Sequence, residues 1–269
     1  NERRMTAKQK LVSLFDLVRN VIFWLLVGLV TIVLSIPLAV LAAFLFPFDR
    51  ERKNIHFFIS FWAKTVITVC PMMTVRLDGA EHLKRGETYI FVANHQSIAD
   101  ILAVLHLRHP FKFVAKQELF WIPFFGWSLF LSGYMPIARG SKTSGRAVLE
   151  RASHYLKRGV SVLLFPEGTR SLDGELRDFK PGAFKLAAEE GIPIVPIIID
   201  GTRDLIPKGS RLMKRHVHVM VHVGKPRSVR KSTDPEVTAR LSEEVRYEMA
   251  ELLRGIRSER QKLMKACCA

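Results

Sequence analysis

A histidine and an aspartate stand five positions apart in the segment Asn-His-Gln-Ser-Ile-Ala-Asp, residues 94–100. A carboxylate beside an imidazole fixes the ring tautomer and stabilises the imidazolium. With Asp100 in that role, His95 could take a proton from a hydroxyl. No serine nucleophile is needed if the substrate supplies its own alcohol. A simpler interpretation is also open, in which Ser97 and Asp100 form a helix-capping pattern and His95 is an incidental loop residue.

The spacing of this pair determines where the two side chains can meet. Each residue of an α-helix turns it by about 100°, so positions five apart on one helix point about 140° apart. We therefore expect a helix to begin near Ser97, with His95 in the preceding loop and folded back over the first turn, where Asp100 points. The start of that helix would also offer backbone donors to an anion.

A second polar segment, Phe-Pro-Glu-Gly-Thr-Arg-Ser at residues 165–171, comes directly after the apolar run 161–164. The turn that follows a strand is where α/β proteins place their sites. Gly168 would let the backbone approach a ligand closely, and the Arg170 guanidinium suits a phosphate. Glu167 could bind a hydroxyl or orient Arg170. The alternative is a polar turn with a local Glu–Arg pair.

These segments lie within a regular alternation of apolar runs and amphipathic stretches. Helical patterns cover 98–107, 143–157 and 180–190, and a long helix with Asp234 as its cap and Pro235 in its first turn follows near the end. The alternation predicts an α/β fold with a mixed, largely parallel sheet flanked by helices. The expected strands are 74–79, 88–93, 111–116, 134–139, 161–165, 193–199 and 216–223.

The N-terminal part has a different texture. Residues 21–48 carry no charge, and about 20 such residues are enough to cross a bilayer. A second apolar stretch begins at 55, so we expect a membrane-embedded helical hairpin over 1–72 and an α/β domain with a C-terminal helix over 73–269. Basic residues are nearly balanced on the two flanks of the first stretch, which fits a hairpin with both ends on the cytoplasmic side. An ordinary spanning helix is the alternative.

The net charge of +16 indicates an anionic partner. Nucleic acid, an anionic membrane and phosphorylated substrates all fit the charge, but the apolar block favours the membrane, and no nucleic-acid motif is present. Three cysteines, one isolated and two adjacent, make neither a disulfide framework nor a metal spacing. Three histidines share one face of the last strand without an acidic or cysteine companion nearby, and we expect no metal there: His216, His218 and His222.

Taken together, the two polar segments resemble the motifs of the glycerolipid acyltransferase family, in particular the PlsC type of 1-acylglycerol-3-phosphate acyltransferase. Two further blocks fit in the family's order. Residues 133–140 resemble the second block, with Gly133, Ile137 and Arg139, and residues 194–199 resemble the fourth, centred on Pro196. The blocks cover roughly residues 75–200. Many relatives have a polar residue before the arginine of the second block, where this chain has Ala138.

The resemblance implies transfer of an acyl group from acyl-CoA or acyl carrier protein to the sn-2 hydroxyl of 1-acylglycerol-3-phosphate, giving phosphatidic acid, at the cytoplasmic face of a membrane. His95 would be the general base and Asp100 would hold it. No cofactor or metal is implied. The aromatic stretch 118–133 would line an acyl pocket, enter the membrane interface or form core. The implied substrate-binding residues are Lys116, Gly133, Arg139, Glu167, Gly168, Thr169 and Arg170.

Three other functions remain open from the sequence. The acceptor could be a different lysolipid, such as a lyso-ornithine lipid. The protein could hydrolyse acyl thioesters with water in place of the alcohol. It could also be a non-enzymatic basic module that binds membranes, which the charge of +16 would permit.

Overall fold

The structure is a computed structural model that describes residues 7–69, 73–206, 213 and 216–268. Its centre is a seven-stranded sheet with the strand order β1-β7-β6-β2-β5-β3-β4. Every neighbouring pair in the described residues is parallel except β6 with β7, which confirms the mixed, largely parallel sheet. The strands are β1 (Met73–Asp78), β2 (Ile90–Ala93), β3 (Phe111–Lys116), β4 (Met135–Ile137), β5 (Ser161–Leu164), β6 (Ile194–Asp200) and β7 (Val217–Val223).

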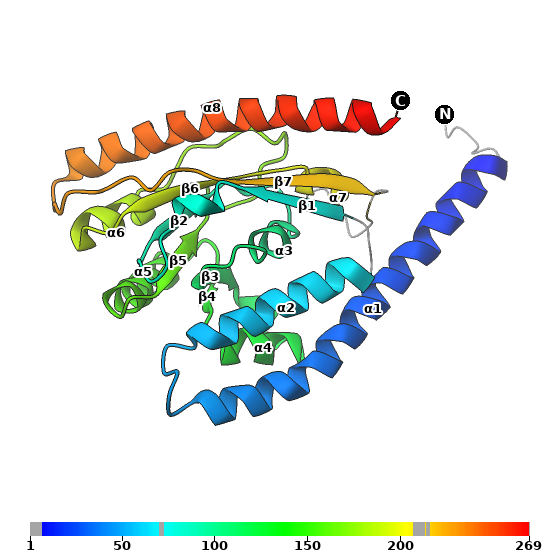
Figure 1. The fold of residues 1–269 in the computed structure, drawn as a ribbon, viewed down its shortest axis with the longest axis horizontal. Coiled ribbons are helices and arrows are strands. Elements are labelled where there is room, and N and C mark those ends of the chain that lie inside the picture. The colour runs from blue at the N-terminus through cyan, green and yellow to red at the C-terminus, as the bar shows by residue number, and fades with distance from the viewer. Residues whose placement is uncertain (1–6, 70–72, 207–212, 214–215, 269) are drawn as a thin grey trace.

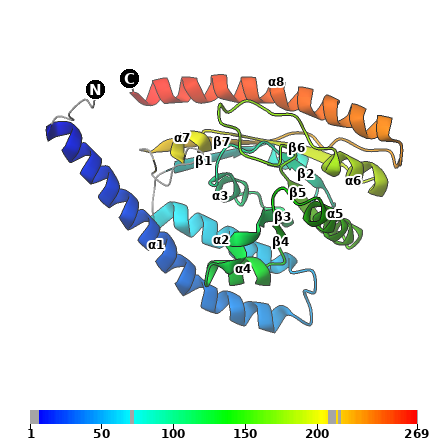
Figure 2. The ribbon, with the colours of Figure 1, turned by 180° about the vertical axis from the view of Figure 1, so that it is seen from behind.

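Helices cover both faces of this sheet (Figures 1 and 2). Successive side chains of a strand point to opposite faces. In β2, Phe91 therefore joins one hydrophobic cluster, and Ile90 and Val92 join the other. The first cluster lies under α2 (Lys53–Val69) and α3 (Asp100–Val104). The second lies under α5 (Lys142–Lys157), α6 (Gly182–Glu190) and α8 (Pro235–Cys268).

The remaining short elements lie in the connections between strands. They are η1 (Ala80–His82), η2 (Gln117–Trp121), α4 (Phe125–Leu131) and α7 (Thr202–Leu205). The predicted cap of α8 is present, since the Asp234 carboxylate accepts a hydrogen bond from the Glu236 amide at 2.8 Å. The parallel strands β2, β5 and β6 all end at the same edge, so the segments that follow them meet there.

Two helices precede the sheet, α1 (Ala7–Leu45) and α2. They lie side by side (Figures 1 and 2), and the Trp62 indole donates to the Thr31 hydroxyl across them at 3.1 Å. Within the described residues, α1 is the one helix long and apolar enough to cross a membrane, over the 31 residues Phe15–Leu45. α2 has only 17 residues and buries one face against the sheet. The structure therefore confirms one long apolar helix in the N-terminal segment. It does not show a clear hairpin, because α2 is not a clear second membrane segment.

α1 and α2 are joined to the rest of the fold by buried contacts. Phe23 of α1 and Ile55 of α2 belong to the same cluster as Phe91 of β2. The side chain of the buried Asn20 exchanges hydrogen bonds with the backbone of Met213, at 2.6 and 3.4 Å. The N-terminal helices therefore share a core with the sheet, while the boundary expected at residue 72 lies outside the described residues.

Candidate active site

The first residue after β2, Asn94, extends the pairing with β6 through its side chain rather than its backbone. Asn94 donates to the Ile199 carbonyl at 2.8 Å and accepts from the Ile199 amide at 2.7 Å, which imitates strand pairing with β6. His95 is therefore the first residue to leave the sheet, at the edge where the parallel strands end. The sequence predicted this loop position.

The structure brings His95 and Asp100 together. The Nδ1 atom of His95 lies 2.7 Å from Oδ2 of Asp100, and the same oxygen accepts the backbone N–H groups of Gln96 and Ser97 at 2.8 and 3.0 Å. Backbone N–H groups can only donate, so Oδ2 is an acceptor and Nδ1 is the donor to it. In the neutral ring the lone pair is then on Nε2, and His95 lines a large pocket.

The Asp100 carboxylate makes both of the contacts considered from the sequence, one to the imidazole and one at the start of the helix. α3 begins at Asp100, and the carboxylate that aims His95 also accepts from the amide of Ser97, as in a helix cap. The helix is shorter than the predicted 98–107, because residues 98–99 form a turn that carries the loop around the carboxylate.

A third residue completes this cluster, and the sequence analysis missed it. Thr202, fully buried at the start of α7, donates its hydroxyl to Oδ1 of Asp100. It follows Gly201, where only glycine fits, because φ is +102° and a Cβ would come within 2.4 Å of the His218 carbonyl oxygen. The available signal was the Asp-Gly-Thr run at residues 200–202, which directly follows the fourth motif block.

The second polar segment, residues 165–171, forms hydrogen bonds with the backbone of His95. The Glu167 carboxylate accepts from the His95 amide at 2.9 Å, and the Ser171 amide donates to the His95 carbonyl at 2.8 Å. The Phe165 ring stacks on the imidazole with a centroid distance of 4.3 Å. Glu167 thus holds His95 in place, which differs from both roles considered for it from the sequence.

Glu167 should make the stability of the protein depend on pH. Burial raises its pKa from the ordinary 4.5 to about 7, although the N–H groups of His95 and Arg177 oppose the shift. The folded state then binds more protons than the unfolded state between these values, so this group's contribution to stability falls as pH rises from 4.5 to about 7. We expect Glu167→Gln, which cannot titrate, to flatten that decline.

Urea unfolding midpoints of both proteins at pH 5, 6, 7 and 8 would measure this effect. The comparison is between slopes, because the glutamine amide also loses one hydrogen bond at every pH. Equal slopes for the two proteins over this range would contradict the expectation.

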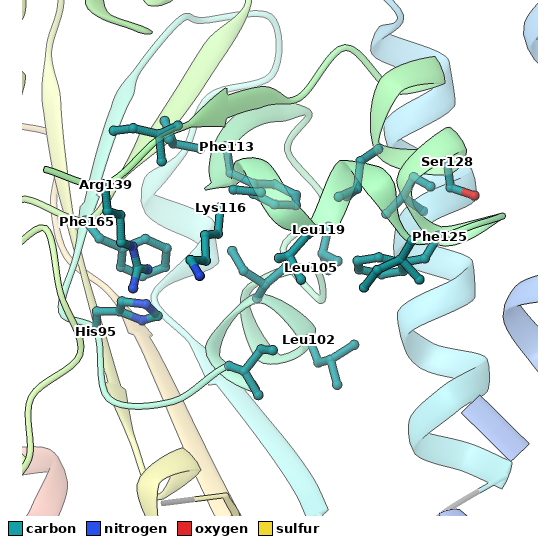
Figure 3. Close-up of a pocket in the computed structure, with 18 of the residues that line it drawn as sticks. His95, Leu102, Leu105, Phe113, Lys116, Leu119, Phe125, Ser128, Arg139 and Phe165 are labelled. Atoms are coloured by element: carbon teal, nitrogen blue, oxygen red, sulfur yellow. The ribbon is translucent and has the colours of Figure 1, made fainter. Parts of the chain in front are cut away.

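The predicted substrate-binding residues fall into two groups. Gly168, Arg139, Arg170 and Lys116 line the pocket with His95. Figure 3 shows the charged ends of Lys116 and Arg139 directed toward the imidazole. Gly168 has a φ of +67°, and a Cβ there would meet the Lys180 side chain at 2.7 Å. Lys180, which lines the same pocket, was not predicted.

Thr169 lies in the same turn, between Gly168 and Arg170. Gly133 lies apart from this group. Its carbonyl accepts the Tyr155 hydroxyl at 2.7 Å, and its φ of +72° reverses the chain between α4 and β4. The glycine of the second block therefore shapes the turn that precedes β4 and Arg139.

The electrostatic character of the pocket is cationic. Burial, and next the neighbouring Arg170 guanidinium, lower the pKa of Arg139. Two guanidinium groups this close favour a bound anion between them. The Lys116 ammonium pairs with Glu118 at 2.8 Å, and both side chains are about half exposed, so this ion pair is weak.

The pocket has a volume of about 1120 Å³ and joins a polar end to an apolar one. His95, Lys116 and Arg139 occupy one end (Figure 3). The other end is apolar, and its lining includes Leu102, Leu105, Phe113, Leu119 and Phe125, together with side chains of α1 and α2. This arrangement suits a molecule with an anionic group, a reactive centre and a long apolar chain.

The aromatic stretch 118–133 serves two surfaces. Leu119, Phe125 and Leu129 line the pocket, whereas Trp121 and Trp127 are exposed, at 77% and 57%. The stretch is therefore divided between side chains that line the pocket and side chains on the surface.

The histidines of β7 have partners on the parallel strand β1. His222 lies 2.6 Å from the Asp78 carboxylate, and His218 lies 2.7 Å from the Thr74 hydroxyl. The fold supplies Asp78, which is distant in sequence. In the part of the chain that the structure describes, no group of three or more His, Cys, Asp or Glu side chains is arranged to hold a metal ion.

The fold and the site define an α/β domain with a buried, aimed imidazole beside a cationic and apolar pocket. Comparison with known proteins gives its family: residues 74–200 match the model of the Acyltransferase family. The chain is 38% identical over 217 residues to the chloroplastic 1-acyl-sn-glycerol-3-phosphate acyltransferase BAT2 of Brassica napus, which is 80% of this chain and 62% of that protein. It is 39% identical over 119 residues to the 1-acyl-sn-glycerol-3-phosphate acyltransferase of Escherichia coli K12, 44% of this chain and 49% of that one.

A solved structure agrees with these relatives. The crystal structure of the 1-acyl-sn-glycerophosphate acyltransferase PlsC from Thermotoga maritima superposes with a TM-score of 0.73 and 28% identity, covering 90% of this chain and 98% of that one. Residues 74–200 match the acyltransferase family, and the resemblance seen in the motifs is confirmed. It spans less than two thirds of the length of the plant relatives, 62% and 60% for the Brassica napus and Arabidopsis thaliana proteins.

Proposed function

We propose that this protein transfers a fatty acyl group from an acyl thioester to the sn-2 hydroxyl of 1-acylglycerol-3-phosphate, giving phosphatidic acid. One observation carries the proposal: the His95 imidazole, held by Asp100 at 2.7 Å, lines a pocket that is cationic at one end and apolar at the other. The relatives from Brassica napus and Escherichia coli are named for this acceptor, which supports the choice.

In the proposed reaction, Nε2 of His95 takes the proton of the acceptor hydroxyl as its oxygen attacks the thioester carbonyl. The resulting imidazolium is stabilised by the Asp100 carboxylate. Collapse of the tetrahedral intermediate breaks the carbon–sulfur bond, and the imidazolium returns its proton to the leaving thiolate. Esterified lipid and free thiol are the products, and the base is restored.

The oxyanion of that intermediate needs donors. The amides of Gln96, Ser97 and Ala99 near the helix start, and of Gly168 in the turn after β5, all donate to groups within the protein. We therefore assign oxyanion stabilisation to Lys116, whose charged end Figure 3 shows directed toward His95 and which the phosphate does not require.

Arg139 and Arg170 would bind the phosphate of the acceptor. Burial, and next the Arg170 guanidinium, lower the pKa of Arg139, so a dianionic phosphate between the two arginines relieves a repulsion as well as forming charge-assisted hydrogen bonds. The acyl chain would extend into the apolar end of the pocket, between α3, α4 and the N-terminal helices.

The N-terminal segment would place the site at a membrane surface. α1 carries exposed apolar side chains along its length, including Leu25, Val33 and Phe44 at 67%, 54% and 71%. With the exposed Trp121 and Trp127, they form a surface suited to lipid. We propose that the segment 1–72 inserts as a hairpin with both ends cytoplasmic, and that the domain 73–269 works on that face with the basic excess held against anionic lipid.

Thr202 is a positioning residue in this mechanism, because it acts through Asp100. Replacement by the isosteric valine removes one hydrogen bond to the carboxylate, so we expect Thr202→Val to lower kcat by ~2–10-fold with the KM of both substrates unchanged. Thr202→Ser, which keeps the hydroxyl, should recover most of the rate. Steady-state kinetics on the three proteins would test this, and a serine variant no better than valine would show that the methyl packing matters instead.

A matrix of donors and acceptors tests the function itself. The protein, reconstituted in vesicles, is given acyl-CoA or acyl carrier protein with lysophosphatidate, another lysophospholipid or a lyso-ornithine lipid, and both ester and free fatty acid are measured. The proposal requires ester formation on lysophosphatidate. Activity confined to another lysolipid would reassign the acceptor, and release of free acid alone would indicate a thioester hydrolase.

A further inference from the structure

The pocket holds more positive charge than the acceptor phosphate can use. Seven lysine and arginine residues line it, and no aspartate or glutamate is among the described lining residues. Three of the seven are the residues beside His95 discussed above, Lys116, Arg139 and Arg170. The other four lie on α5, on α6 or just before α6, and are called here the α5–α6 wall: Lys142, Arg146, Lys180 and Lys185.

The wall is a continuous part of the pocket. α5 and α6 lie side by side (Figures 1 and 2) and pack through Leu149 and Gly182, where a Cβ on the glycine would meet Leu149 at 3.1 Å. Gly145, on α5 between two of the cations, leaves open space where a side chain would be, with no heavy atom within 4 Å of a Cβ. The wall therefore places cationic side chains next to open space, because Gly145 has no side chain to fill it.

The wall's own acidic neighbours do not neutralise it. Arg146 lies 3.0 Å from Glu150, and Lys185 lies 3.7 Å from Glu189, but both pairs are exposed i,i+4 contacts on one helix. Such pairs contribute little and are screened by salt. Neither acid lines the pocket, so a ligand inside it faces only the cations.

We propose that the α5–α6 wall binds the phosphates of coenzyme A, the 3′-phosphate and the 5′-diphosphate, when the acyl donor enters the pocket. This inference rests on the proposed function, which requires two substrates in one site. The acceptor phosphate takes Arg139 and Arg170, so the remaining cations face the second substrate. The wall cations line the pocket and also reach its exposed mouth, where the phosphates of a small polyanion can lie while its acyl group enters the cavity. Binding of an acidic carrier protein to the same cations is an alternative outcome of the test.

The kinetic test removes two charges of the wall, with Lys142→Ala and Arg146→Ala in one protein. The matched control carries Arg151→Ala and Lys157→Ala, two cations of the same helix that do not line the pocket. Because each exposed charge pair contributes a factor of a few, we expect the KM for acyl-CoA to rise ~10-fold in the wall variant and to stay unchanged in the control. The KM for lysophosphatidate should stay the same in both.

Two substrate analogues locate the effect on the phosphates. An acyl-dephospho-CoA donor lacks the 3′-phosphate. Relative to acyl-CoA, it should bind the wild type more weakly, and this loss of affinity should be smaller in the wall variant. An acyl-pantetheine donor, which has no phosphate, should be used equally by the two proteins. An equal loss with acyl-pantetheine would overturn the proposal. So would an unchanged KM for acyl-CoA combined with weaker use of acyl carrier protein or weaker binding to anionic vesicles.

A binding measurement separates this proposal from the proposed function. Adenosine 3′,5′-diphosphate has no acyl group and cannot react, so its binding by calorimetry needs no activity. Binding to the wild type and the control, weakened ~10-fold in the wall variant, supports the wall even if the acceptor differs from lysophosphatidate. Equal binding to all three proteins would overturn the wall and leave the catalytic proposal intact.

Discussion

The His95→Ala variant is expected to fold normally and to lose acyl transfer by a factor of ~10²–10⁴, the contribution typical of a positioned base. The imidazole lines the pocket, and in its neutral form the lone pair is on Nε2 because Nδ1 donates to Asp100. Removal leaves a space that opens to the pocket and fills with water, so the fold should tolerate it. Initial rates in vesicles with acyl-CoA and lysophosphatidate, and the thermal midpoint of both proteins, would measure the effect.

A histidine elsewhere in the fold provides the control. His222 also has a carboxylate partner, Asp78 at 2.6 Å, but it lies on β7 and is not among the pocket residues. His222→Ala should leave the rate unchanged. A His95→Ala protein with wild-type rate and wild-type stability would remove the imidazole from the mechanism, whatever the behaviour of the control.

Much of this arrangement could be predicted from the chain alone, because it depends on local patterns. All seven strands follow from short apolar runs bounded by turn residues. The loop position of His95 follows from a spacing that one helix cannot accommodate. Arg139 and Arg170 were identified by their motifs, and the parallel sheet then brings the ends of β4 and β5 to one edge.

The rest depends on contacts between distant residues, which no local pattern contains. Thr202 meets Asp100 across 102 positions, and the Glu167 carboxylate meets the His95 amide across 72. The sequence offered Glu167 a substrate hydroxyl or the nearby Arg170 as its partner, because only neighbours in the chain or a ligand can be proposed from a local motif. α2 was assigned to the membrane from its apolar residues, yet those on one face pack into the sheet's own core.

The Asp100 variants should differ from one another in a way that only the observed hydrogen bonds predict. Oδ2 accepts three N–H groups, whereas Oδ1 accepts a hydroxyl, which can also act as an acceptor. In Asp100→Asn the amide can therefore turn its NH2 toward Thr202 and its oxygen toward His95. The tautomer is kept and only the negative charge is lost, so we expect kcat to fall ~10–100-fold with little loss of stability.

Asp100→Ala removes the acceptor altogether. The buried amides of Gln96 and Ser97 lose their partner at about 1–3 kcal/mol each, and His95 loses its orientation. Activity should then fall as far as in His95→Ala, and urea unfolding should show the largest loss of stability among these variants. Equal stability of the alanine and asparagine variants would contradict this account of the carboxylate.

The double variant Asp100→Asn with Thr202→Val tests the orientation of the amide directly. Without the threonine hydroxyl, the NH2 group has no acceptor on its own side, so only the three N–H groups that face the oxygen still orient the amide, and a flip becomes easier. A flipped amide would place a donor against three donors, so the loss in kcat should exceed the product of the two single effects. Simple multiplication of the single effects would mean that the loop around residues 95–99, and not Thr202, sets the orientation at Asp100.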